Sequence, residues 1–169
     1  AKTGFFFVLK YFEYFIVFFM MVNHVDSLDQ VNRFIFCLLT TCFIVSIICM
    51  TQIPGGGRVT APFEGETGEP NTLGGYLVFV GAIAAGLFFG AEKMRTKQML
   101  VALMIVILPP FLFAQSRSSY LAFIPAYLVI GLMSEKRVII VGLMIISLAA
   151  SPFFLPDTVK NRILFTFTQ

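Results

Sequence analysis

Two arginines in this chain lie where arginine is costly, each in a polar link between long apolar runs. Arg58 follows three consecutive glycines, and Arg117 lies between serines in the segment Gln-Ser-Arg-Ser-Ser. A guanidinium at the rim of a membrane helix bundle needs an anionic partner, because its charge cannot be lost and its planar fork suits phosphate. The spacing alone equally allows each arginine to cap a helix end or to pair with a glutamate.

Glutamates of the loop after Arg58 are the candidates for acid–base chemistry. Glu64, Glu66 and Glu69 follow this arginine closely in the sequence. Transfer of a group to a hydroxyl needs a base, and Glu66 and Glu69 are the weak candidates for that role. Loop carboxylates are usually solvated and unperturbed, so the catalytic residue stays unassigned.

No pattern of metal ligands accompanies these residues, so the sequence predicts no metal site. The cysteines share a single apolar run without histidine or carboxylate near them. We expect them to pack as small buried hydrophobes, as free cysteine commonly does. They are Cys37, Cys42 and Cys49.

The composition places these residues in a membrane protein. Hydrophobic residues make up 58% of the 169 residues and charged residues only 12%, and the mean hydropathy is +0.90. A soluble domain has about 25% charged residues, so this class is excluded. The net charge of +3 comes without a long basic run, so we expect no nucleic-acid partner.

Six apolar runs supply the elements that must position the arginines. Each is near or somewhat below the roughly 20 residues that span a bilayer, and helix is the expected form because lipid satisfies no backbone polar group. We therefore expect an all-α, polytopic bundle of about six membrane helices, in one transmembrane domain over residues 1–169 with an outward loop at 54–74. The runs are 4–22, 34–53, 75–90, 99–115, 120–133 and 138–155.

Lysine and arginine indicate the orientation. The links 23–33, 92–98 and 134–137 fall on one side under strict alternation and hold most of the basic residues of the links. The positive-inside rule makes that side cytoplasmic, so Arg58 and Arg117 face outward together.

Two local patterns predict details of the helices. Pro109-Pro110 is expected to break the fourth run, because proline removes a ladder hydrogen bond. Gly81, Ala85 and Phe89 share one face of the third run, and this face, with the glycines Gly86 and Gly90 beside it, is expected to mark close helix packing.

Three segments resemble parts of the O-antigen ligase and polymerase superfamily. The first is the loop from Arg58 through Phe-Glu-Gly and Glu-Pro-Asn to Leu-Gly-Gly-Tyr-Leu, which resembles the family's outward loop. The second is Gln-Ser-Arg-Ser-Ser around Arg117, which is similar to a Ser-Arg segment between two helices. The third is residues 156–163, similar to the start of the large periplasmic loop. The resemblance covers nearly the whole chain.

This resemblance implies a GT-C-like membrane glycosyltransferase of the bacterial inner membrane. The donor would be a polyprenyl-diphosphate-linked glycan, and the acceptor a sugar hydroxyl on lipid A core or a growing polysaccharide. Catalysis would take place at the periplasmic face without metal or cofactor. Arg58 and Arg117 match the arginines that hold the diphosphate, with Asn71, Ser116 and Arg162 as supporting residues.

The family's catalytic histidine lies in its large periplasmic loop and has no match before Gln169. His24, the chain's single histidine, falls on the cytoplasmic side under the expected topology. We therefore expect the chain to be a fragment of a longer protein. Two alternatives remain: a membrane transporter or flippase, which should show paired helix breaks in two repeated halves, and a noncatalytic membrane protein.

Overall fold

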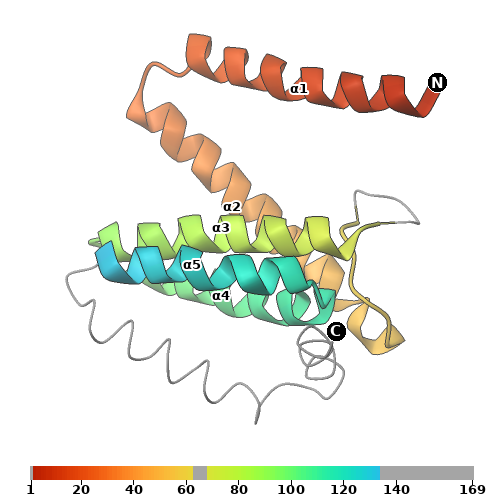
Figure 1. The fold of residues 1–169 in the computed structure, drawn as a ribbon. Helices are drawn as coiled ribbons and strands as arrows, with labels where there is room; N and C mark the ends of the chain where they lie inside the picture. Colours follow the sequence, from red (N-terminus) through yellow and green to blue (C-terminus); the bar gives the residue numbers. More distant parts are fainter. Residues whose placement is uncertain (1, 63–67, 134–169) are drawn as a thin grey trace. The chain divides into compact units, whose positions relative to one another are not determined.

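The computed structural model describes the backbone of residues 2–62 and 68–133, and side chains from residue 12 onward within those ranges. Within them the chain is helical without strands, which confirms the all-α class. It divides into two compact units, Ala1–Leu38 and Leu39–Gln169, each described by itself. The elements are α1 Lys2–His24, α2 Leu28–Met50, the 3-10 helix η1 Ile53–Gly55, α3 Pro70–Gly90, α4 Met94–Ala114 and α5 Arg117–Met133 (Figure 1).

Three of these helical segments are long and apolar enough to cross a membrane. They are Leu28–Gly55, Pro70–Gly90 and Met94–Ala114, and the shorter apolar helices are Phe12–His24 and Arg117–Met133. The expected sixth run, residues 138–155, lies outside the described residues. A membrane protein with several helical spans is therefore supported, and about six spans remains a prediction.

The first unit contains α1 and the start of α2. Side chains of α1 from Phe12 to Val22 are exposed, as expected for a helix surrounded by lipid. A capping box begins α2: the Gln30 N–H donates to Ser27 Oγ at 3.4 Å, and the Ser27 N–H donates back to Gln30 Oε1 at 3.4 Å. The Asp26 N–H also donates to Gln30 Oε1, at 2.8 Å. These bonds satisfy donors that the helix itself leaves unpaired, so α2 begins before its apolar run does.

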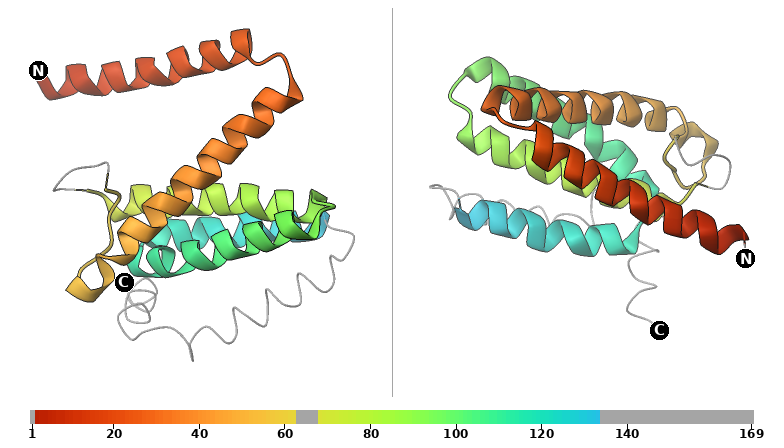
Figure 2. Two further views of the ribbon diagram at one scale, coloured as in Figure 1. Left: turned by 180° about the vertical axis from the view of Figure 1, so that it is seen from behind. Right: turned by 90° about the horizontal axis from the view of Figure 1, so that it is seen from above.

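In the second unit, α3 packs against both α4 and α5. The N-terminal ends of α3 and α5 and the C-terminal end of α4 lie at one end of this group (Figure 1), which is seen again from behind (Figure 2). We call it the loop end, because residues 56–62 also lie there. The buried face of α3 repeats at helical spacing, through Leu73, Leu77, Val80 and Ala84.

Glycine allows close packing at one of the three expected positions. A Cβ at Gly81 would lie 2.6 Å from the Tyr127 hydroxyl, so α5 approaches closely there. A Cβ at Gly86 or Gly90 would meet no atom within 4 Å, so the prediction is wrong for these two. They lie about 140° and 180° around the helix from Gly81, away from the face that meets α5.

The two prolines, Pro109 and Pro110, interrupt the hydrogen-bond ladder, as expected, but do not end the helix. Helix α4 continues through both prolines and ends at Ala114. Each proline lacks an N–H donor, so the Ile105 and Val106 carbonyls lose their usual i+4 partners while the backbone stays helical. Gln115 then ends α4 in the left-handed conformation, with φ 50° and its N–H bonded to the Leu112 carbonyl at 3.3 Å.

Candidate functional site

The loop after η1 is held against the loop end by specific hydrogen bonds. The Val59 N–H donates to the Phe113 carbonyl at 3.1 Å, and Val59 is fully buried. The Gln52 side chain pairs with the backbone of Thr60, donating from Nε2 at 3.0 Å and accepting at Oε1 at 3.1 Å. Gly56, with φ 72°, makes the turn that sends the chain back toward α4. The loop therefore places Arg58 beside the end of α4.

Arg58 binds the C-terminal end of α4. Its Nε donates to the Ala114 carbonyl at 3.2 Å, and its Nη2 donates to the Gln115 carbonyl at 3.1 Å. The last carbonyls of a helix lack partners inside it and form the negative end of its dipole, so a cation is favourable here. The helix-capping alternative for Arg58 is thus confirmed.

Arg117 lies at the opposite kind of helix terminus. It is the first residue of α5, where the helix dipole is positive and a cation is unfavourable. Neither α5 nor α3 has an acidic side chain in its first turn to offset that charge. The positive end of the α5 dipole and the guanidinium of Arg117 therefore lie at the same helix terminus.

Ser116 has a structural role that differs from the expected supporting role at a ligand. Its hydroxyl accepts the Ser119 N–H at 3.3 Å, and its carbonyl accepts the Tyr120 N–H at 3.1 Å, which makes it the N-cap of α5. The side chain is fully buried and also bonds to Ser119 Oγ at 2.7 Å. Ser116 therefore fixes the first turn of α5, and with it the position of Arg117.

The two arginines meet in one hollow at the loop end. This hollow, which we call the anion hollow, has a volume of about 340 Å³ and is lined by polar and charged residues. Ligand pockets usually measure about 300–1,000 Å³, so it is large enough for a small polar group. Its described lining residues come from the loop, from the first turns of α3 and α5, and from the link before α5: Arg58, Asn71, Gln115, Arg117 and Ser118.

Two helix N-termini contribute to this hollow. Asn71 is the second residue of α3, and Arg117 and Ser118 are the first two residues of α5. N–H groups in the first turn of a helix have no partner within the helix and attract anions, phosphate above all. The two cations and the two N-termini together make the hollow a site suited to an anion with several oxygens.

Other expected site residues are absent from this lining. Glu69 is exposed, and its carbonyl accepts the Thr72 N–H at 3.1 Å at the start of α3. Glu66 and Arg162 lie outside the described residues. Gln115 and Ser118 line the hollow but were not expected from the sequence, although both belong to the Gln-Ser-Arg-Ser-Ser segment that drew attention to Arg117.

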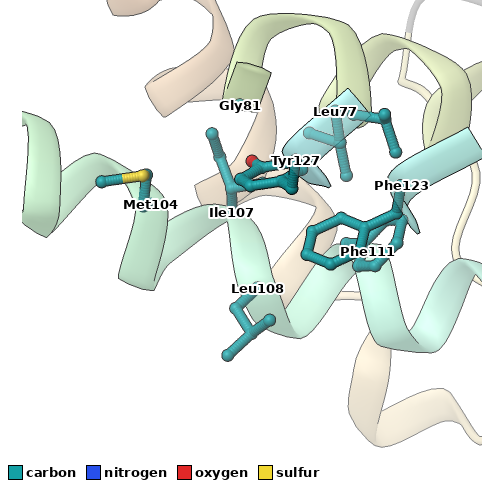
Figure 3. Close-up of a pocket in the computed structure, with 9 residues that line it drawn as sticks. Leu77, Gly81, Met104, Ile107, Leu108, Phe111, Phe123 and Tyr127 are labelled. Atoms are coloured by element: carbon teal, nitrogen blue, oxygen red, sulfur yellow. The ribbon is translucent and has the colours of Figure 1, made fainter. Parts of the chain in front are cut away.

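An apolar crevice lies between α3, α4 and α5. Figure 3 shows aromatic side chains of α4 and α5 lining it, among them Phe111, Phe123 and Tyr127. Its volume of about 40 Å³ is far below that of usual ligand pockets, so it is a packing gap. The rings of Phe123 and Tyr127 stack at 4.2 Å between centroids and close one side of it.

The three cysteines differ in their burial. Cys42 and Cys49 are fully buried in α2, as expected from the sequence. The expectation of burial is wrong for Cys37, which is exposed. Within the described ranges, no group of three or more His, Cys, Asp or Glu side chains is placed to hold a metal ion.

Comparison of this chain with protein-family models, with curated proteins and with solved structures finds no match.

Proposed function

We propose that this protein is a membrane glycosyltransferase of the O-antigen ligase or polymerase type. It would bind a polyprenyl-diphosphate-linked glycan in the bacterial inner membrane and support transfer of the glycan to a sugar hydroxyl at the periplasmic face. The observation that carries this proposal is the anion hollow, where Arg58 and Arg117 meet two helix N-termini.

The place of the hollow suits a lipid carrying a diphosphate. It lies at the end of apolar helices, two of which, α3 and α4, are long enough to cross a bilayer. A polyprenyl chain could remain in the membrane while its diphosphate reaches the helix ends. A freely soluble anion would not need a site at the rim of such a bundle.

The chemistry needs the hollow to stabilise a leaving group. The acceptor hydroxyl oxygen attacks the anomeric carbon, the bond from that carbon to the diphosphate oxygen breaks, and the diphosphate leaves with the electron pair. Guanidinium groups and helix N-termini stabilise the charge that develops on it. The hydroxyl proton passes to a general base, for which Glu66 and Glu69 remain weak candidates.

The sequence resemblance supports the same assignment. Arg58 and Arg117 match the family's diphosphate arginines, and Asn71 belongs to its Pro-Asn motif. All three line the anion hollow. Residues from separate motifs thus lie around one cavity, as a shared ligand would require.

Binding is the first test. The protein is purified into lipid nanodiscs, and its affinity for a polyprenyl diphosphate is measured for the wild type, Arg58→Ala, Arg117→Ala and the double variant. If both arginines hold the same group, each single variant should bind at least about tenfold more weakly, and the two losses should not add. Strictly additive losses, or wild-type binding in Arg117→Ala, would reject the shared site.

Transfer is the second test, and it separates the enzyme from the alternatives. The wild type, expressed in its own membrane, is given a lipid-linked glycan and a polysaccharide or lipid A core acceptor. Formation of the glycosidic product with release of polyprenyl diphosphate supports the transferase. Movement of the lipid-linked glycan across the bilayer without product would favour a flippase.

A further inference from the structure

Gly74 lies where α3 passes against the beginning of α5. It is buried, and a Cβ built on it would lie 2.9 Å from Ser119 Cβ and 3.1 Å from Ser116 Cβ, with Ser119 Oγ nearer still. Ordinary contact begins at 3.4 Å, so the 2.9 Å contact would require the two helices to part by about 0.5 Å. Rotation of the Ser119 side chain cannot relieve a clash with its Cβ, so the backbone itself would have to move.

The serines that Gly74 contacts flank Arg117 in the sequence and hold it in place. Ser116 and Ser119 are both buried and are joined by a 2.7 Å hydrogen bond between their hydroxyls. They fix the first turn of α5, in which Arg117 is the first residue. A displacement of this serine pair would therefore move Arg117.

Gly74 also lies near the N-terminal end of α3, the second helix terminus that contributes to the anion hollow. Asn71 lies three residues before it on α3, hence on nearly the same face of the helix and one turn nearer the loop end. The contact at Gly74 thus determines how closely Asn71 approaches the start of α5. Asn71 lines the hollow together with Arg117 and Ser118 at the start of α5, whereas Gly74 does not line it.

We infer that Gly74 is a positioning residue of the anion hollow: its lack of a side chain lets the first turns of α3 and α5 lie close enough to bind one anion together. The inference rests on the proposed anion site and adds a residue that does not touch the ligand. Binding groups must be held within about 0.5 Å of their productive geometry. The displacement that one methyl group requires is of that size.

Two glycines of the same helix serve as controls. A Cβ at Gly75 would meet no atom within 4 Å, so Gly75→Ala adds the same methyl group without a clash. Gly81 contacts the Tyr127 hydroxyl, seven residues and about 10 Å further along α3 (Figure 3). Gly81→Ala therefore disturbs packing between α3 and α5 without touching the serine pair.

The experiment measures binding of inorganic pyrophosphate to the purified protein in nanodiscs by calorimetry, with thermal unfolding of each variant alongside. Gly74→Ala should weaken binding by at least about tenfold, whereas Gly75→Ala and Gly81→Ala should stay within about twofold of the wild type. Equal losses in Gly74→Ala and Gly81→Ala would show general loosening of the packing and overturn the inference.

If Gly74→Ala does not fold, a compensating substitution at Ser119 still allows the inference to be tested. Ser119→Gly removes the side chain that the new methyl group would strike, so Gly74→Ala in this background should fold and bind pyrophosphate as Ser119→Gly alone does. A folded double variant that binds much more weakly than Ser119→Gly contradicts the positioning role. Wild-type binding in Gly74→Ala, with binding lost in Arg117→Ala, would also reject it and leave the proposed site standing. Absence of pyrophosphate and polyprenyl diphosphate binding by the wild type would reject the proposed site itself.

Discussion

Arg58 and Arg117 should differ in what they contribute to stability, although both line the anion hollow. Arg58→Ala removes two hydrogen bonds from a charged donor to the end of α4, at 3.2 and 3.1 Å. Such bonds contribute about 1.5–3 kcal/mol each, and a cation at a helix C-terminus adds about 0.3–1 kcal/mol. Because the side chain is only half-buried, the lower values apply, and we expect a loss of about 3 kcal/mol.

Arg117→Ala should cost much less. Arg117 lies at the positive end of the α5 dipole, so its removal also relieves an unfavourable interaction of about 0.3–1 kcal/mol. We expect the free energy of unfolding to change by less than about 1 kcal/mol.

Arg58→Lys is the matched control for Arg58→Ala, because it keeps the charge at the end of α4 but cannot make both bonds with one planar group.

Steric trapping in nanodiscs measures these free energies reversibly without removing the bilayer. The expected order of destabilisation is Arg58→Ala, then Arg58→Lys, then Arg117→Ala. Equal losses in the two alanine variants, or a larger loss for Arg117→Ala, would refute the argument from helix dipoles.

Three further predictions concern activity, the loop and topology. Arg117→Lys keeps the charge but loses the planar fork, so glycan transfer at matched protein level should fall by more than about 100-fold, the equivalent of two charge-assisted bonds; a wild-type rate would show that the fork is unnecessary. Gln52→Ala removes both bonds to Thr60 and should lower the free energy of unfolding by about 1–3 kcal/mol, and a change below about 0.5 kcal/mol would contradict that. In a protein without its native cysteines, a cysteine in place of Gly57 should react with an impermeant reagent from outside and one in place of Thr96 should not; the reverse pattern would invert the orientation.

The helical class was predictable because it depends on composition. A chain this apolar must satisfy its backbone hydrogen bonds internally in lipid, and helices do so without long-range partners. The helix boundaries were less predictable from apolar runs. The run expected from residue 34 belongs to a helix that begins at Leu28, because Ser27 and Gln30 cap a polar first turn that hydropathy does not detect.

Arg58, Arg117 and Asn71 were also recognisable as candidates from the sequence, because arginine beside apolar runs is costly and each belongs to a short motif. Their sequence positions could not decide between capping a helix and binding a ligand. The structure shows that Arg58 caps α4 from 56 residues away and lines the anion hollow as well. The structure also shows that Ser116, which the resemblance suggested as a supporting residue of the ligand site, is the N-cap of α5.

The sequence by itself determined that this protein is helical and built for a membrane, because those properties follow from each segment's own hydropathy and backbone. Only the tertiary structure decided which residues share the anion hollow. That outcome depends on contacts such as the one between Gly74 and Ser119. Because Gly74 has no side chain, α3 and α5 can approach more closely there than any other residue would allow. Local periodicity carries no information about such distances, since they are determined jointly by residues far apart in the chain.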